Sequence, residues 1–402
     1  MLRRTFLAAS AAPILRAADS YAAPDWEAPL FHLHNRLKAP VRITSIDVLR
    51  AGGKILVRTN SSAGISGITI AKDPIDDYLP ILLRRIVPFF TGKDARDIES
   101  LIDKVYEANY KLAGQGFWLP VAAVETSIWD LLGRTANKPV ADLLGGARMK
   151  SVPVYLSGSG REAAAEEEVD VYVRGVQETG ARAVKFKIGG RMSRNADATP
   201  GRTDKMLALA RKRFGPNVVL YADANGSYDV RRAIEVGRYL ESLDFKFFEE
   251  PCPWEQIEWT KAVSDALKIP VAFGEQNSSL AEFNRIIAMR AFKIVQPDLN
   301  YNGGIVKSAR VARMAARAGM TIVNHNTETG AAGAKTLHFA AAIPNFGPDI
   351  EWARRATPKP VSWQSPSLID VTDGAVPLPA GPGFGVDYDP AYLAKVEILK
   401  RA

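Results

Sequence analysis

The chain has 402 residues, of which 47% are hydrophobic, so it is long enough to bury the core of one barrel with an added domain. Its formal net charge of +8 is modest for this length and no basic run contains interleaved aromatic residues, which argues against nucleic-acid binding and suits an anionic small substrate. The one cysteine, Cys252, cannot form an intramolecular disulfide, and the absence of Cys/His metal spacing argues against redox and zinc roles.

The N-terminal segment, residues 1–23, has the pattern of a twin-arginine export signal. Arg3 and Arg4 precede an apolar stretch that runs to Leu15, and small residues follow. This pattern predicts a periplasmic or otherwise exported protein. Arg16 departs from a clean signal, so a basic helix on a cytoplasmic protein remains the alternative. No other apolar run is long enough to predict a membrane span.

The next elements are an N-terminal arm and a pair of strands. The arm, residues 24–38, contains a His-x-His pattern at His32 and His34, for which packing against the cap or a neighbouring subunit is favoured over metal binding. Residues 43–50 and 54–60 are predicted strands, and the turn between them is very short.

Six segments of the second half are predicted to be buried parallel strands. They are short, continuous apolar runs, which suit a sheet that is covered on both faces, and amphipathic helical patterns separate them. The segments are residues 183–190, 218–226, 245–251, 269–276, 292–300 and 319–326. With residues 152–158 and 350–354 they make eight strands, the number in a TIM-type barrel.

Each of the six segments ends in a potential catalyst or metal ligand, where a barrel gathers its functional side chains. These residues are Lys187, Asp223, Glu249, Glu275, Asp298 and His325. The three acids that end consecutive strands are spaced by about one βα unit, so we expect their carboxylates to converge. Oxygen-only ligation of this kind suits a hard cation, Mg²⁺ first and Mn²⁺ second. Three acids in register argue against helix capping as their role.

Candidate bases flank the acids on both sides. Alternation along the strand sends Lys185 and Lys187 to the same face, and two neighbouring ammonium groups should lower the pKa of one of them. On the other side, Asp298 is expected on the strand next to His325. Its carboxylate can then accept the imidazole N–H and favour the protonated form.

Six short motifs follow one another along these strands. They are Lys-x-Lys at 185–187, Asp-x-Asn at 223–225, Glu-Glu-Pro at 249–251, Gly-Glu at 274–275, Gln-Pro-Asp at 296–298 and Asn-His at 324–325. Together they resemble the enolase superfamily, mandelate racemase subgroup, the mandelate racemase/muconate lactonizing enzyme-like proteins. The match covers nearly everything after residue 38, and residues 128–146 are similar to the segment that closes the family's capping domain.

The resemblance implies an α/β fold, a modified TIM barrel of (β/α)7β type with an α+β capping domain. We expect the capping domain at residues 39–148, the barrel at 149–360 and a C-terminal tail at 361–402 that completes the cap. Family members often form homo-oligomers, so a homo-oligomer is expected here without a fixed number of subunits.

The resemblance also implies a role for each site residue. The metal ligands are Asp223, Glu249 and Glu275; the catalytic residues are Lys187 with Lys185, and His325 with Asp298; the substrate-binding residues are Asn225 and Glu351. The expected cofactor is Mg²⁺, with Mn²⁺ as the alternative. The expected partner is a small carboxylate substrate, because abstraction of its weakly acidic α-proton requires a cation to stabilise the enediolate. A Lys or His base that works beside Mg²⁺ is the arrangement of enolase-superfamily sites in general.

Two reactions are compatible with a base on each side of the substrate. Dehydration of an acid sugar is favoured over racemisation or epimerisation, because the short turn at 51–53 leaves almost no lid and suits a longer, polar substrate. The stretch at 71–78 is a candidate for polar cover. A pseudoenzyme that binds an anion without turnover is the non-enzymatic alternative, and the intact set of ligands and bases argues against it.

Overall fold

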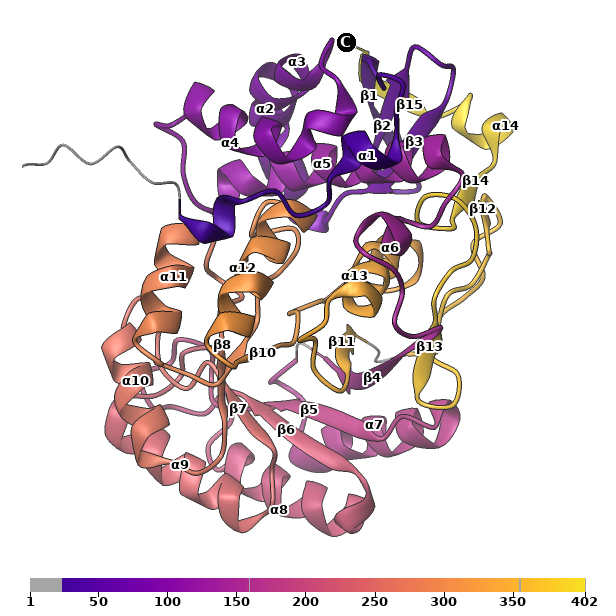
Figure 1. The fold of residues 1–402 in the computed structure, drawn as a ribbon. Helices are drawn as coiled ribbons and strands as arrows, with labels where there is room; N and C mark the ends of the chain where they lie inside the picture. The colour runs from indigo at the N-terminus through magenta and orange to yellow at the C-terminus, as the bar shows by residue number, and fades with distance from the viewer. Residues whose placement is uncertain (1–23, 159, 354–355, 402) are drawn as a thin grey trace, which may run out of the picture.

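A barrel and a smaller domain above it make up the computed structural model, which describes residues 24–158, 160–353 and 356–401 (Figure 1). The predicted export signal at residues 1–23 lies outside the described residues. Within the described ranges, none of the helices combines the length and the apolar character that a membrane crossing requires.

The smaller domain, which we call the cap, is a four-stranded antiparallel sheet packed against helices. The sheet has the order β15-β1-β2-β3, so the C-terminal strand returns to the cap and pairs with its first strand. Its strands are β1 (Ile43–Ala51), β2 (Lys54–Ser61), β3 (Ser66–Ile70) and β15 (Glu397–Arg401). Its helices are α2 (Leu79–Ile81), α3 (Val87–Phe90), α4 (Ile98–Ala108), α5 (Gln115–Ala136) and α6 (Val140–Leu143), with short helical turns η2 (Asp73–Tyr78), η3 (Leu82–Ile86) and η4 (Ala95–Asp97).

The larger part is a modified TIM barrel, as predicted. Parallel strands follow the order β10-β9-β8-β7-β6-β5-β4-β11, and an isolated parallel bridge joins Ile322 of β10 to Phe346, just before β11. The strands are β4 (Ser151–Ser157), β5 (Ala183–Lys187), β6 (Val219–Asp223), β7 (Phe247–Glu249), β8 (Val271–Phe273), β9 (Ile294–Val295), β10 (Thr321–Ile322) and β11 (Ile350–Ala353). The helices between them are α7 (Ala165–Thr179), α8 (Arg202–Phe214), α9 (Val230–Ser242), α10 (Ile257–Ala266), α11 (Leu280–Ala288), α12 (Ile305–Arg317) and α13 (Gly330–Ala342), with the turn η5 (Gly215–Asn217).

The register of the barrel strands places the functional residues at one level. Lys187 is the register partner of Asp223, and Asp223 is the register partner of Glu249. Deeper in the barrel, the rings of Tyr221 and Phe247 stack with centroids 3.9 Å apart, which fills the interior below the polar residues. The register therefore carries the acids to the open end of a packed core.

The N-terminal arm and the C-terminal segment tie the two parts together. The arm contains η1 (Asp25–Glu27) and α1 (Leu33–Arg36); the C-terminal segment contains β12 (Gln364–Ser365), β13 (Ala375–Pro377), β14 (Asp387–Tyr388) and α14 (Pro390–Leu393). The arm packs on the cap, as expected, because the buried ring of Phe31 meets the edge of Trp129 at 5.0 Å. His34 contacts Asp97 at 2.8 Å in an exposed pair.

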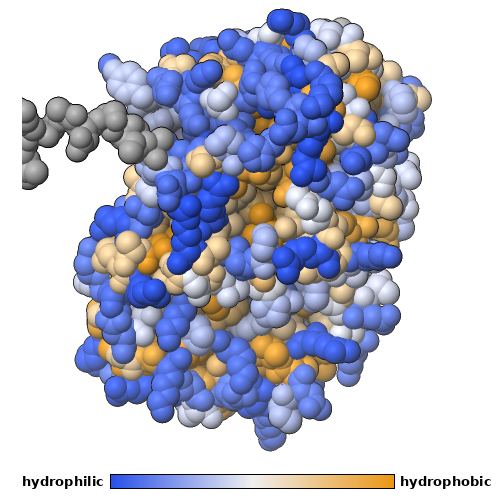
Figure 2. All heavy atoms as spheres, in the orientation of Figure 1, coloured by the Kyte–Doolittle hydropathy of each residue, from blue (hydrophilic) through white to orange (hydrophobic). Residues whose placement is uncertain are grey.

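Figure 2 shows hydrophilic residues over most of the face that Figure 1 presents, with hydrophobic residues visible between the cap and the barrel.

Candidate active site

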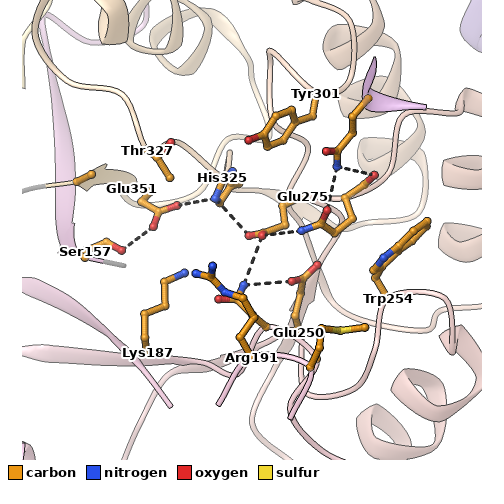
Figure 3. A pocket seen from close by; sticks show the side chains of 17 residues that line it. Ser157, Lys187, Arg191, Glu250, Trp254, Glu275, Tyr301, His325, Thr327 and Glu351 are labelled. Carbon is orange, nitrogen blue, oxygen red and sulfur yellow. Dashed lines mark hydrogen bonds and ion pairs between the residues drawn. The ribbon is translucent and has the colours of Figure 1, made fainter. Parts of the chain in front are cut away.

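A cavity of about 560 Å³ opens where the barrel strands end toward the cap (Figure 3). Lys187, Glu275, His325 and Glu351 line it from the barrel, and Gln115 lines it from the first turn of α5 in the cap. A cavity at the carboxyl ends of barrel strands, with contributions from a second domain, is the usual place for a small-molecule site.

The three acids that end consecutive strands converge beside this cavity, as predicted. Asp223 ends β6, Glu249 ends β7 and Glu275 lies just after β8. All three are buried, and each offers a carboxylate oxygen within 4.8 Å of the others. We call these residues the acid cluster.

The donor set of the acid cluster suits a hard divalent cation. It supplies carboxylate oxygens alone, which Mg²⁺ and Mn²⁺ prefer. Glu275 Oε2 is buried and accepts no hydrogen bond within the described ranges, although His325 Nε2 lies 3.3 Å away. Burial raises the pKa of Glu249 well above its usual range, and the charge of Asp223 raises it further. Nearby positive charge is therefore needed to keep the whole cluster ionised.

The two lysines of β5 occupy the same side of the strand and are already paired with acids. The Lys185 ammonium donates to Glu249 Oε2 at 2.7 Å and lies 3.0 Å from Glu351 Oε1. The Lys187 ammonium contacts Asp223 Oδ2. The Lys185 ammonium also lies 3.6 Å from Asp223 Oδ2, so both lysines reach the same carboxylate and the predicted common orientation is confirmed.

The prediction that one of these lysines has a lowered pKa is wrong for this arrangement. Burial pulls the pKa of Lys187 down and the charge of Lys185 adds to that effect, but the carboxylates of Asp223, Glu351 and Glu249 together outweigh both, and the pKa lies above its ordinary value. Burial likewise lowers the pKa of Lys185, while Glu249 and Glu351 raise it well above the usual range. The prediction considered the repulsion between the two ammonium groups. It did not include the carboxylates of Asp223, Glu249 and Glu351, which lie beside them.

His325 and Asp298 form the predicted pair on neighbouring strand ends. The two residues are joined by a parallel backbone bridge, and His325 Nδ1 donates to Asp298 Oδ2 at 2.7 Å. Burial lowers the pKa of His325, but the charge of Glu275 and the hydrogen bond to Asp298 raise it to about 9. The expected support of the protonated imidazole is therefore confirmed.

Glu351 and Asn225 both line the cavity. Glu351 Oε1 accepts a hydrogen bond from Ser157 Oγ at 2.6 Å, and Glu351 Oε2 lies 4.0 Å from His325 Nε2. Asn225 Oδ1 accepts a hydrogen bond from Arg161 Nη2 at 2.7 Å, which directs the amide nitrogen of Asn225 toward Glu275 Oε1 at 3.4 Å. Their predicted roles in substrate binding stay predictions.

Several polar residues of the site were missed from the sequence. Gln296 Nε2 donates to Glu249 Oε2 at 3.0 Å, and its place in the Gln-Pro-Asp motif was the available signal. Glu250, the second acid of Glu-Glu-Pro, lines the cavity, and burial raises its pKa well above the usual range. Lys72, from the stretch proposed as polar cover, reaches Asp298, and nothing in chain order could indicate that contact.

Comparisons with known proteins agree with this architecture. Residues 27–145 match the family described as mandelate racemase / muconate lactonizing enzyme, N-terminal domain, and residues 167–392 match enolase C-terminal domain-like proteins. Arabinonate dehydratase of Saccharolobus solfataricus is 29% identical over 317 residues, which cover 77% of this chain and 81% of the relative. D-galactarolactone cycloisomerase of Agrobacterium fabrum is 28% identical over 311 residues, covering 74% and 79%.

A solved structure shares the arrangement of most of the chain. The mandelate racemase/muconate lactonizing protein from Paracoccus denitrificans PD1222, complexed with magnesium, superposes with a TM-score of 0.81 at 27% identity. The superposition covers 90% of this chain and 99% of that one.

Proposed function

Because the chain belongs to the mandelate racemase/muconate lactonizing enzyme family of enolase-like proteins, we propose that it abstracts the α-proton of a carboxylate substrate and dehydrates an acid sugar. The observation that carries the proposal is the placement of two candidate bases on one cavity with the acid cluster between them. Lys187 contacts Asp223 of the cluster, and His325 Nε2 lies 3.3 Å from Glu275 Oε2. Figure 3 shows Lys187 and His325 reaching the cavity from different strands.

We assign the acid cluster, Asp223, Glu249 and Glu275, as the residues that hold the cofactor, Mg²⁺ or alternatively Mn²⁺. When bound, such a cation would supply positive charge to the substrate carboxylate and would offset the charge of Asp223, the strongest of the carboxylates that raise the pKa of Lys187.

Lys187 and His325 then have complementary roles. His325, with a pKa of about 9, is protonated at neutral pH and is suited to donate a proton from Nε2, since Nδ1 is held by Asp298. Lys187 accepts the α-proton through Nζ. In dehydration, the β-hydroxyl leaves with the His325 proton as water, and the enol product rearranges to a 2-keto acid. Glu351 and Asn225, which both line the cavity, are proposed to orient the substrate.

The lining of the cavity suits a polyhydroxy acid. Gln115, Arg191 and Gln276 line it together with Tyr301 and Thr327. Amide, guanidinium and hydroxyl groups can hydrogen-bond to sugar hydroxyls, whereas a compact apolar substrate would leave them unpaired. The arabinonate dehydratase similarity supports the same class of substrate.

Racemisation or epimerisation is the second candidate, because two bases on one cavity also permit removal of a proton on one face and its return on the other. The deciding experiment is a screen of mono- and dicarboxylic sugar acids with Mg²⁺, in which 2-keto products and stereochemical inversion are followed in parallel by NMR. Keto products support the dehydratase. Inversion at C2 without keto product moves the assignment to an epimerase, and no change across the library contradicts the proposed substrate class.

A further inference from the structure

Lys72 is a cap residue whose ammonium group lies inside the barrel site. It follows β3 closely in the chain, and its side chain is only 6% exposed. Its Nζ donates to Asp298 Oδ2 at 3.0 Å and to Thr327 Oγ1 at 2.9 Å, and it lies 4.6 Å from the centroid of the Tyr301 ring. The ammonium therefore has three favourable partners, all of them on barrel loops.

One oxygen of Asp298 accepts hydrogen bonds from both Lys72 and the imidazole of His325. Asp298 Oδ2 accepts hydrogen bonds from Lys72 Nζ at 3.0 Å and from His325 Nδ1 at 2.7 Å. The other oxygen, Asp298 Oδ1, accepts hydrogen bonds from the backbone amides of Asn300 at 2.7 Å and Tyr301 at 3.2 Å. Of these donors, Lys72 is the one that comes from the cap.

We propose that Lys72 is a positioning residue that acts through Asp298 to fix the imidazole of His325, so that the docked cap completes this half of the site. The inference rests on the proposed role of His325. Loop amides hold Oδ1 of Asp298, whereas Oδ2 is oriented by Lys72 and His325 themselves. Without Lys72, the carboxylate can pivot about Oδ1, which Asn300 and Tyr301 hold, and the imidazole that follows Oδ2 loses its alignment with the cavity.

Because both groups are buried, the Lys72 ammonium and the Asp298 carboxylate each depend on the other for a charged partner. A buried ammonium is costly unless it is paired, and a buried carboxylate that loses a charged partner is destabilised as well. Removal of either Lys72 or Asp298 should therefore leave the other as a buried charge without this partner, although the two residues lie in different parts of the fold. The cap then contributes directly to the geometry of a barrel base, in addition to covering the cavity.

The inference is tested with Lys72→Met, Lys72→Arg and a matched control, Lys54→Met. Lys54 is likewise a cap lysine paired with an aspartate, but that partner is Asp73 of the cap. The Lys54 side chain is 46% exposed and does not reach Asp298. We expect Lys72→Met to lower kcat at least about tenfold with a smaller change in KM, Lys72→Arg to restore part of the loss, and Lys54→Met to match the parent. In an Asp298→Asn background, Lys72→Met should have little further effect. Parent-like turnover of Lys72→Met, or full additivity with Asp298→Asn, overturns the inference.

A second measurement separates this inference from the proposed function. The chain contains four histidines, so ¹⁵N-histidine NMR spectra are simple, and His325→Asn identifies the His325 signals. We expect the Nδ1 signal of His325 to shift in Lys72→Met and to stay unchanged in Lys54→Met. If Lys72→Met does not fold, Lys72→Gln serves in its place. A shift in a protein without acid-sugar turnover would contradict the proposed function and support the positioning role, whereas an unchanged His325 signal overturns the positioning role whatever the activity.

Discussion

Glu125 Oε2, from helix α5 of the cap, accepts a hydrogen bond at 3.1 Å from the backbone amide of Ile305, the first residue of barrel helix α12. Glu125 Oε1 accepts two more hydrogen bonds, from the Val306 amide at 2.9 Å and from Trp129 Nε1 at 2.7 Å. A Cβ at Gly304 would lie 2.3 Å from Glu125 Oε2, so only glycine permits this approach. A cap carboxylate thus closes the N-terminus of a barrel helix, where unpaired amides favour negative charge.

Replacing Glu125 with alanine should destabilise the protein. The change leaves the Ile305 and Val306 amides and the Trp129 indole without their buried acceptor, which costs about 3 kcal/mol in free energy of unfolding. Urea unfolding of the parent and of Glu125→Ala measures the difference. Glu166→Ala, which removes a carboxylate from the surface, is the control and should leave the unfolding midpoint unchanged. Equal midpoints for the parent and Glu125→Ala would contradict the capping role.

His338 should make the stability of the protein depend on pH. Its Nδ1 accepts a hydrogen bond from the Ala141 amide and its Nε2 donates one to the Phe384 carbonyl, both at 3.2 Å, which only the neutral imidazole can do. Burial lowers the pKa of His338 from 6.5 to about 4. Between these values the unfolded chain binds the proton and the folded chain does not, so the stability present above pH 6.5 is lost as the pH falls toward 4.

Below pH 4, the lowered pKa of His338 should reduce the free energy of unfolding by about 3 kcal/mol in total. Urea unfolding of the parent and of His338→Asn at a series of pH values between 7 and 4 checks it. The introduced asparagine does not titrate, so the variant should lose this part of the slope while keeping the slope from other groups. Parallel pH curves for the two proteins would contradict the prediction.

Removal of divalent cations should abolish turnover, because the acid cluster is the proposed cofactor site. Activity should disappear in excess chelator and return with Mg²⁺ or Mn²⁺. Calorimetric titration should detect Mg²⁺ binding to the parent and to Glu255→Gln, whose acid is exposed, and should detect none with Glu249→Gln. Full turnover in chelator, or undiminished Mg²⁺ binding by Glu249→Gln, would contradict the assignment.

The two bases should differ in the proton transfers that they support. Lys187→Ala and His325→Asn should each lower kcat by about 10²- to 10⁴-fold, the usual contribution of a general acid or base. In D₂O, His325→Asn should still exchange the α-proton of the substrate through Lys187, and Lys187→Ala should not. Lys205→Ala, on the exposed surface, is the control. The reverse pattern of exchange would swap the two roles, and parent-like turnover of both variants would contradict the two-base mechanism.

The sequence predicted the barrel and its polar strand ends because those properties repeat locally. Parallel strands that are buried on both faces must be short apolar runs, and a barrel carries every strand end to the same rim. Lys187, Asp223 and His325 could therefore be placed at one site from their positions in successive βα units alone. The contact of His325 with Asp298 followed from the same regularity.

Tertiary structure decided the contacts between the cap and the barrel and the protonation of the site. Lys72 meets Asp298, and Glu125 meets Ile305, across parts of the chain whose mutual placement no local pattern encodes. The pKa of Lys187 depends on the competition between burial and the nearby Asp223 carboxylate, and reasoning from like charges predicted the wrong direction. Electrostatic energies depend on the distance and burial of every neighbouring charge, and these are fixed only when the chain has folded.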